Sequence, residues 1–122
     1  MSEPRFFQVT FHGQRTTYEL ALDFTSHIHA IVELSETERY HFRDTLDRKA
    51  TALAVALSRA TNLPVVAERR AACDKVLPVA HECAAMLDIL AARQTVPADV
   101  LEPARSVLRV LIGRIEGLAA PN

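Results

Sequence analysis

The feature that most constrains the fold is a row of apolar residues that repeats every three or four positions between residues 73 and 90. The row consists of Cys73, Val76, Ala80, Cys83, Leu87 and Leu90. Alternating spacings of three and four place these side chains on one face of an α-helix, as in the seam between nearly antiparallel helices of a bundle. Such a face needs partner helices to cover it.

Three other segments repeat the pattern. The first stripe starts from about Thr17 and consists of Ala21, Phe24, Ile28 and Ile31, widened by Tyr18, Val32 and Leu34. The next consists of Phe42, Leu46, Ala50, Leu53, Leu57 and Ala60. The last consists of Leu101, Ala104, Leu108, Leu111, Ile115 and Leu118. Ala52, Ala54, Val55 and Ala56 extend the second stripe, so we expect that helix to be buried on two sides. Four helices joined by short connections must alternate in direction. The prediction is an all-α, antiparallel up-down-up-down four-helix bundle over residues 17–119.

Local signals give the expected helix ends. Ser35 and Glu38 have the spacing of a capping box, which predicts that the second helix starts there. Asn62-Leu63-Pro64 ends that helix, because the residue before a proline is disfavoured in the α conformation. Pro78 lies inside the third stripe and predicts either a kink or a break that would make residues 65–76 a separate helical piece.

Residues 1–16 are expected to form an N-terminal arm. Its apolar side chains alternate with polar ones from Phe7 onward, which is typical of a short extended segment. These side chains either pack against the domain's own surface or contact a neighbouring subunit. The candidate oligomer contacts are Phe6, Phe7, Val9 and Phe11.

Composition limits the compartment and the class of partner. The chain has 122 residues, enough for one domain with its own core, and a formal net charge of −1, which gives no general attraction to nucleic acid or anionic lipid. Cys73 and Cys83 lie roughly 15 Å apart along a helix, too far for a disulfide, and are expected to be reduced core residues. No apolar run is long enough to span a membrane and no signal peptide is evident, so we expect a cytoplasmic protein.

Positive charge is concentrated in the middle of the chain. Residues 39–75 carry eight basic and four acidic side chains. Seven of the basic residues form the hypothesis for nucleic-acid or partner binding: Arg39, Arg43, Arg48, Lys49, Arg59, Arg69 and Arg70. The alternative is a solvated surface with local ion pairs, Asp44 with Arg48 and Asp47 with Arg43.

Short patterns that could carry chemistry are incomplete. Glu38 and His41 form one Glu-x-x-His motif, whereas a di-iron bundle needs two such motifs and two further Glu. The sequence His81-Glu82 begins like a zinc-protease signature but has Ala85 where the second His should be. Cys83 has no positioned base and is expected to be an inert core thiol. We therefore expect no enzymatic activity, catalytic residue, metal or cofactor.

The stretch Glu82-Cys83-Ala84-Ala85-Met86-Leu87-Asp88-Ile89-Leu90 resembles the third-helix segment E-C-A-A-x-L-D-x-L of the four-helix-bundle family that includes the 23S ribosomal RNA intervening-sequence proteins. Leu46-Asp47-Arg48-Lys49-Ala50 is similar to the helix-two motif of that family. The chain departs from the family after this motif, because residues 52–60 lack the Asn and the Glu-Gly turn that the family has in this stretch. Glu82 and Asp88 are expected to pair with Arg48 or Lys49 across the two helices.

The resemblance also implies a function. Relatives in this family include the basic accessory variability proteins of diversity-generating retroelements, which form pentameric rings and bind RNA and a reverse transcriptase; this chain lacks their strong positive charge. The expectation is a bacterial, non-enzymatic accessory protein that forms a homo-oligomer, a pentamer by resemblance, with structured RNA or a nucleic-acid-processing protein as candidate partner. Arg48 and Lys49 are the leading candidates for RNA contact. The alternative is a structural protein–protein interaction module that binds no nucleic acid.

Overall fold

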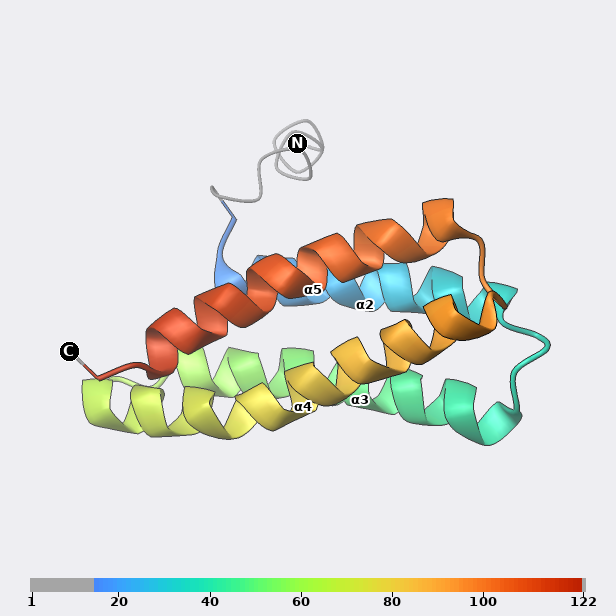
Figure 1. Cartoon of the computed structure of the whole chain (residues 1–122). Coiled ribbons are helices and arrows are strands. Elements are labelled where there is room, and N and C mark those ends of the chain that lie inside the picture. The colour runs from blue at the N-terminus through green and yellow to red at the C-terminus, as the bar shows by residue number, and fades with distance from the viewer. Residues whose placement is uncertain (1–14, 122) are drawn as a thin grey trace, which may run out of the picture.

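The chain folds into four packed α-helices. A computed structural model describes residues 15–121, which contain the helices α2 (Thr17–Leu34), α3 (Tyr40–Thr61), α4 (Val66–Arg93) and α5 (Ala98–Ala119) and no strand. Each helix packs against the next and α2 also packs against α5, so the four surround one core. Consecutive helices run in opposite directions (Figure 1). The predicted all-α four-helix bundle is confirmed, whereas the predicted N-terminal arm lies outside the described residues.

The core is made of the predicted apolar stripes. All six residues of the stripe in α4 are buried, each at most 4 % exposed, and Phe24 is the largest fully buried side chain. Burying a Leu or Phe side chain contributes about 1.5–3 kcal/mol, so these stripes supply most of the favourable energy of folding. Three residues assigned to stripes are instead exposed: Tyr18, Leu34 and Leu118. Tyr18 and Leu34 lie at the two ends of α2.

The expectation that α3 is buried on two sides is wrong. Ala54 is buried and Ala56 is partly buried, but Ala52 and Val55 are exposed. In a bundle of four, α3 packs against α2 and α4, and no further helix of the described chain covers its outer face. The alanines on that face therefore reflect high helix propensity rather than burial.

The predicted capping box at the start of α3 is also wrong. α3 begins at Tyr40 with Arg39 as its N-cap and has no side-chain capping bond, while the Ser35 hydroxyl donates to the Val32 carbonyl at 3.1 Å. The side chain of Glu38 is instead bound by residues near the end of α4, so a tertiary contact replaces the local one. A capping box that the sequence analysis missed starts α2, where Thr16 and Glu19 exchange bonds of 3.0 and 2.8 Å.

The predicted break at Pro78 is absent, because α4 is one helix of 28 residues that continues through this proline. Proline removes the backbone bond to the carbonyl four residues earlier, that of Asp74. Both Pro78 and Asp74 are exposed, so water can hydrogen-bond this carbonyl. The packing of the stripe on both sides of Pro78 keeps the helix whole.

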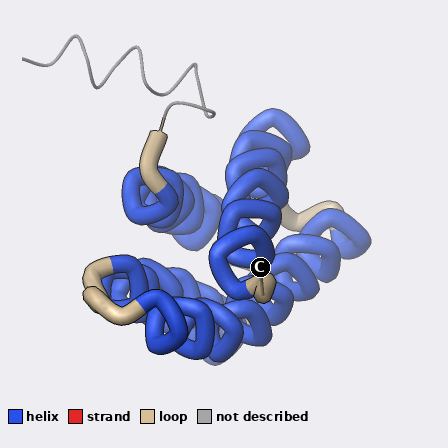
Figure 2. Tube along the Cα trace, turned by 90° about the vertical axis from the view of Figure 1, so that its left-hand side faces the viewer, coloured by secondary structure: helices blue, strands red, loops and turns tan. Residues whose placement is uncertain are grey.

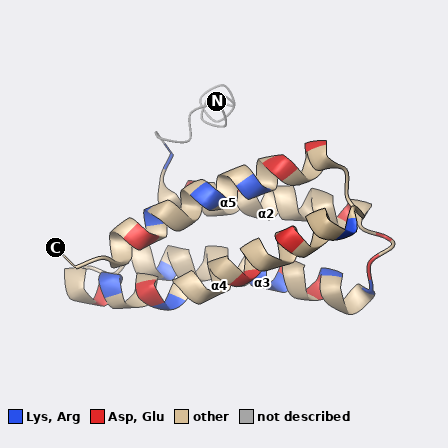
Figure 3. Cartoon of the chain, in the orientation of Figure 1, with Lys and Arg blue, Asp and Glu red and all other residues tan. Residues whose placement is uncertain are grey.

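The outer faces of the helices are polar and mixed in charge. Basic and acidic residues are interspersed along the helices (Figure 3). None of the helices in residues 15–121 combines the length and apolar character that a membrane-spanning segment needs.

Candidate functional site

The seven basic residues of the binding hypothesis are spread over the whole length of the bundle. Arg39 precedes the first residue of α3, whereas Arg69 and Arg70 lie in the first turns of α4, at the opposite end. The others lie between them along α3. The structure therefore does not bring these residues into one compact cluster.

Three of the seven are already bonded within the chain. Arg48 Nε donates to Asp44 Oδ2 at 2.8 Å and Lys49 Nζ donates to Glu82 Oε1 at 2.9 Å, which confirms both predicted pairs. Arg69 donates to the carbonyls of the α3–α4 connection, at 2.8 Å to Leu63. The two leading candidates for RNA contact thus each have an internal carboxylate partner.

The remaining four have no such partner. Arg39, Arg59 and Arg70 make no side-chain hydrogen bond or ion pair with any residue in the described part of the chain, and Arg43 Nε is buried without a hydrogen-bond partner. The predicted pair of Arg43 with Asp47 is not formed. Among the seven candidates, these are the guanidinium groups without a carboxylate or carbonyl partner in the described part of the chain.

A buried carboxylate closes the end of the bundle where the α2–α3 and α4–α5 connections meet, here called the polar end. The Glu38 side chain is 5 % exposed, and its two oxygens accept from Arg93 Nη1 at 2.5 Å and from Thr95 Oγ1 at 2.9 Å. Gln94 ends α4 with a left-handed φ of 57°. The next residue, Thr95, is the one that bonds to Glu38. The three residues tie the two connections together.

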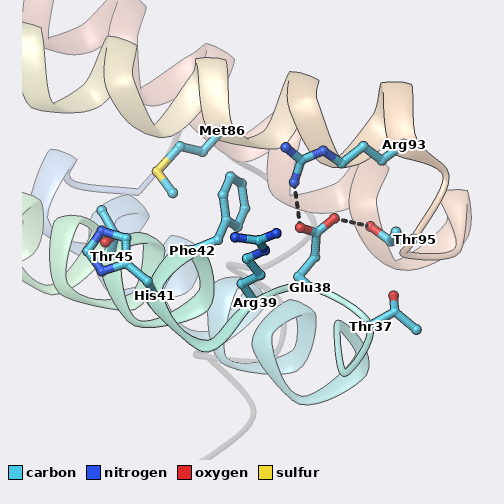
Figure 4. Close-up of a pocket in the computed structure, with 9 residues that line it drawn as sticks. All are labelled: Thr37, Glu38, Arg39, His41, Phe42, Thr45, Met86, Arg93 and Thr95. Carbon is cyan, nitrogen blue, oxygen red and sulfur yellow. Dashed lines mark hydrogen bonds and ion pairs between the residues drawn. The ribbon is translucent and has the colours of Figure 1, made fainter.

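A pocket of about 790 Å³ adjoins this carboxylate. Its lining comes from the α2–α3 connection, the first turns of α3 and the last turns of α4: Thr37, Glu38, Arg39, His41, Phe42, Thr45, Met86, Arg93 and Thr95. Phe42 and Met86 reach toward one another from the two helices (Figure 4), and the Arg93 guanidinium lies 5.5 Å from the centroid of the Phe42 ring. The pocket combines an apolar wall with arginines, hydroxyls and one imidazole.

The same pocket contains the Glu-x-x-His motif, but not as a metal site. Glu38 and His41 both line it, yet the Glu38 carboxylate is occupied by Arg93 and Thr95. Among the described residues no group of three or more His, Cys, Asp or Glu side chains could hold a metal ion. Arg93 and Thr95 were missed in the sequence because they lie more than fifty positions from Glu38 and carry no local motif.

The two cysteines are buried free thiols, as predicted. Burial raises the pKa of the Cys83 thiol to about 12, although Lys49 acts in the opposite direction. Burial also raises the pKa of Cys73, with Arg69 lowering it. Both thiols stay protonated near neutral pH and are poor nucleophiles.

The opposite end of the bundle is apolar and uncovered. We call it the apolar end and define it by Leu63, Val65, Val66 and Leu118, from the α3–α4 connection, the first residue of α4 and the last turn of α5. These segments lie together at one end (Figures 1 and 2), beyond the first residue of α2. Val65 and Val66 are each 50 % exposed and Leu118 is 41 % exposed.

Asp88 in the matched segment pairs with α5 rather than with α3. Its carboxylate accepts from Arg105 at 2.8 Å, and Arg105 also donates to Glu102. The expected pairing of Asp88 with Arg48 or Lys49 is therefore wrong, because Asp88 lies on the side of α4 that faces α5.

Comparison with models of known protein families, with curated proteins and with solved structures finds no match to this chain.

Proposed function

We propose that this chain is a non-enzymatic accessory protein that works by self-association, with the apolar end as its contact surface. The observation that carries the proposal is Leu118. It follows Leu111 and Ile115 at spacings of four and three and so continues the buried stripe of α5, yet it is 41 % exposed because the other helices do not cover it. A core position without a cover is the kind of surface that a subunit contact buries.

Charge around the apolar end supports a second copy of the same chain as the occupant. Glu68 and Glu116 are exposed near Val66 and Leu118, and neither side chain has a partner among residues 15–121. Arg70, close by in α4, also has none. A surface that offers unpaired groups of both signs can pair with a copy of itself. The net charge of −1 adds little repulsion between copies.

The test is the mass of the protein in solution, measured by light scattering during size-exclusion chromatography. We expect the full chain at about 100 µM to form an oligomer, a five-membered ring if the family resemblance holds, and the double variant Val66→Glu, Leu118→Glu to be monomeric, because buried unpaired carboxylates oppose association. Val55→Glu is the matched control: this exposed valine lies on the outer face of α3, and its substitution should leave the mass unchanged.

Two results would contradict the proposal: a monomeric full chain at this concentration, or a double variant that keeps the oligomer mass. Removal of residues 1–14 tests the arm separately. If this truncation alone yields monomers while the double variant does not, Phe6, Phe7, Val9 and Phe11 make the contact instead of the apolar end.

RNA association is the second candidate function, and the unpaired arginines favour it. Arg39 before α3, Arg59 on α3 and Arg70 on α4 have no partner in the described part of the chain, whereas Arg48 and Lys49 are bonded to carboxylates. Groups that need not break an ion pair to reach a phosphate bind it at lower cost.

The RNA hypothesis is tested by retention of a structured RNA on a filter at several salt concentrations. We expect retention that falls steeply with salt and falls again in the double variant Arg59→Glu, Arg70→Glu. Arg105→Glu on α5 serves as the control, since Arg105 is bonded to Asp88 and Glu102. Retention that is absent at low salt, or unchanged in the double variant, would reject RNA binding and leave self-association as the function.

A further inference from the structure

The pocket at the polar end has the dimensions of a small-molecule site. Its volume of about 790 Å³ falls within the range of roughly 300–1,000 Å³ that is typical of ligand pockets. It lies between α3 and α4, so two packed helices rather than a single loop support most of its wall. A rigid wall of this kind can hold a ligand in one orientation.

The lining of this pocket carries a net positive charge. With His41 neutral, Arg39 and Arg93 bring two positive charges and Glu38 one negative charge. The Glu38 carboxylate accepts from Arg93 and Thr95, so its charge is already balanced. The guanidinium of Arg39 remains, without a partner among the described residues. The pocket therefore favours an anion over a neutral or cationic ligand.

Hydrogen-bond donors are in excess as well. A guanidinium group has five N–H donors, and one nitrogen of Arg93, Nη1, is bonded to Glu38. Arg39 provides a second planar set of donors on the wall. The first turn of α3, which carries His41 and Phe42, has no side-chain cap, so its backbone N–H groups add partial positive charge to the same wall. Arginines of this kind bind carboxylate and phosphate through pairs of N–H groups.

The apolar part of the wall indicates what the uncharged part of the ligand is. The Phe42 ring is partly buried, with the Arg93 guanidinium 5.5 Å from its centroid, and the thioether of Met86 beside it is flexible enough to adapt to a group placed against it. Thr37 and Thr45 border this surface and add hydroxyl groups. A ligand that matches the wall therefore has a charged head and a flat apolar body.

We propose that this pocket binds an organic anion in which a phosphate or carboxylate, held by Arg39 and the free N–H groups of Arg93, is attached to a flat apolar group that packs on Phe42 and Met86. This site goes beyond the proposed self-association. It lies at the other end of the bundle from Val66 and Leu118, so each of the two proposals can fail without the other.

The experiment is an NMR titration of the ¹⁵N-labelled full chain with phenyl phosphate and, in a second arm, with benzoate. We expect saturable shifts of the amide signals of Phe42 and Thr95 with a dissociation constant below about 1 mM for at least one of the two anions. Which anion binds more tightly identifies the head group. Inorganic phosphate lacks the apolar body and benzyl alcohol lacks the charge, so each should bind at least about tenfold more weakly.

A pair of variants links the shifts to the pocket. Arg39→Gln should weaken binding by about fivefold or more, because it removes the unpaired charge from an exposed position without disturbing the bonds of Glu38. Arg59→Gln is the control, an equally unpaired arginine that lies on α3 and outside the pocket, and should leave binding unchanged. Shifts that do not saturate by about 10 mM, that map to residues away from the pocket, or that are equal in the two variants would overturn the proposal.

Discussion

The two ends of the bundle are finished in opposite ways. At the polar end, the buried carboxylate of Glu38 joins the connections between helices through Arg93 and Thr95. At the apolar end, Leu118 and Val66 lie exposed although Leu118 belongs to a core stripe. Leu34 and Tyr40 are also exposed at the polar end, but neither continues a buried stripe as Leu118 does. The contrast is therefore between a buried carboxylate that is bonded within the chain and a core stripe that ends in water.

The difference bears on the proposed self-association. A buried charge is tolerated only when it is paired and hydrogen-bonded, and the polar end meets this requirement by itself. Exposed apolar surface has no such solution within residues 15–121 and is stabilised only by something that covers it. The polar end therefore contributes to the stability of one chain, and the apolar end is the surface that the proposed self-association would bury.

The largest effect is expected from breaking the polar end. The Glu38 carboxylate is 5 % exposed in the folded chain, and in Arg93→Ala it keeps only the Thr95 hydroxyl as partner. We expect a loss of about 2 kcal/mol in the free energy of unfolding, less than for a fully buried pair because Arg93 is half exposed. Urea unfolding followed by circular dichroism measures this loss.

A matched control separates burial from charge. Arg105→Ala removes an arginine that bridges Asp88 and Glu102, both of them exposed carboxylates. Pairs of this kind are worth about 0.5 kcal/mol. If the two variants lose the same stability, the polar end is not held by its buried carboxylate, and the contrast between the ends is weaker than proposed.

The second effect concerns the two cysteines of α4, of which Cys73 lies nearer the apolar end. The pKa of Cys83 is raised by burial from 9.0 to about 12 in the folded chain. Below pH 9 the thiol is protonated in both states, so the stability linked to it is fully present. Between pH 9 and 12 the unfolded chain releases the proton and the folded chain keeps it, so stability falls by about 1.4 kcal/mol for each pH unit.

Unfolding in urea at pH 8 and pH 10 measures this slope. Cys83→Ala should reduce the loss between the two pH values, and Cys73→Ala should reduce it less, since burial raises the pKa of Cys73 by less than that of Cys83. Equal reductions by the two variants would mean that burial affects the two thiols of α4 equally.

The third effect is at the start of α2. The first residue of this helix does not reach the apolar end. Thr16→Ala removes the side chain that accepts from the Glu19 amide at 3.0 Å, and should cost about 1 kcal/mol. Thr17→Ala is the control, since Thr17 is the first residue of the helix and has no capping bond. Thermal unfolding of both variants is the measurement; equal losses would exclude a specific role for the cap.

Much of this fold is predictable from the spacing of apolar residues. The stripe of Cys73, Val76, Ala80, Cys83, Leu87 and Leu90 is buried in full, and the start of α2 at Thr17 and the end of α3 at Thr61 follow from local signals. The spacing does not predict burial where a residue lies beyond the helices that would cover it. Leu118 has the right periodicity, but its 41 % exposure depends on how the other helices pack along the last turn of α5, which the spacing within α5 does not predict.

The candidate site is less predictable, because its parts are distant in sequence. Local rules assign Glu38 to a capping box, whereas Arg93 and Thr95 bind it across 55 and 57 positions. The pairs of Arg48 with Asp44 and Lys49 with Glu82 could be proposed, since one is local and the other joins two resembling segments. No pattern in the sequence places Phe42 against Met86.

The smallest expected effect sharpens the boundary of the apolar end. Gly117→Ala adds a methyl group that meets nothing within 4 Å, and alanine has the higher helix propensity, so the single chain should gain about 0.5 kcal/mol. Gly113→Ala, one turn earlier and equally open, should behave alike. Thermal unfolding measures the gain and light scattering the mass. Gly117 is exposed next to Leu118, so a contact confined to the four residues of the apolar end leaves the mass unchanged. A variant that is more stable as a single chain yet assembles less would instead extend the contact onto the outer face of α5.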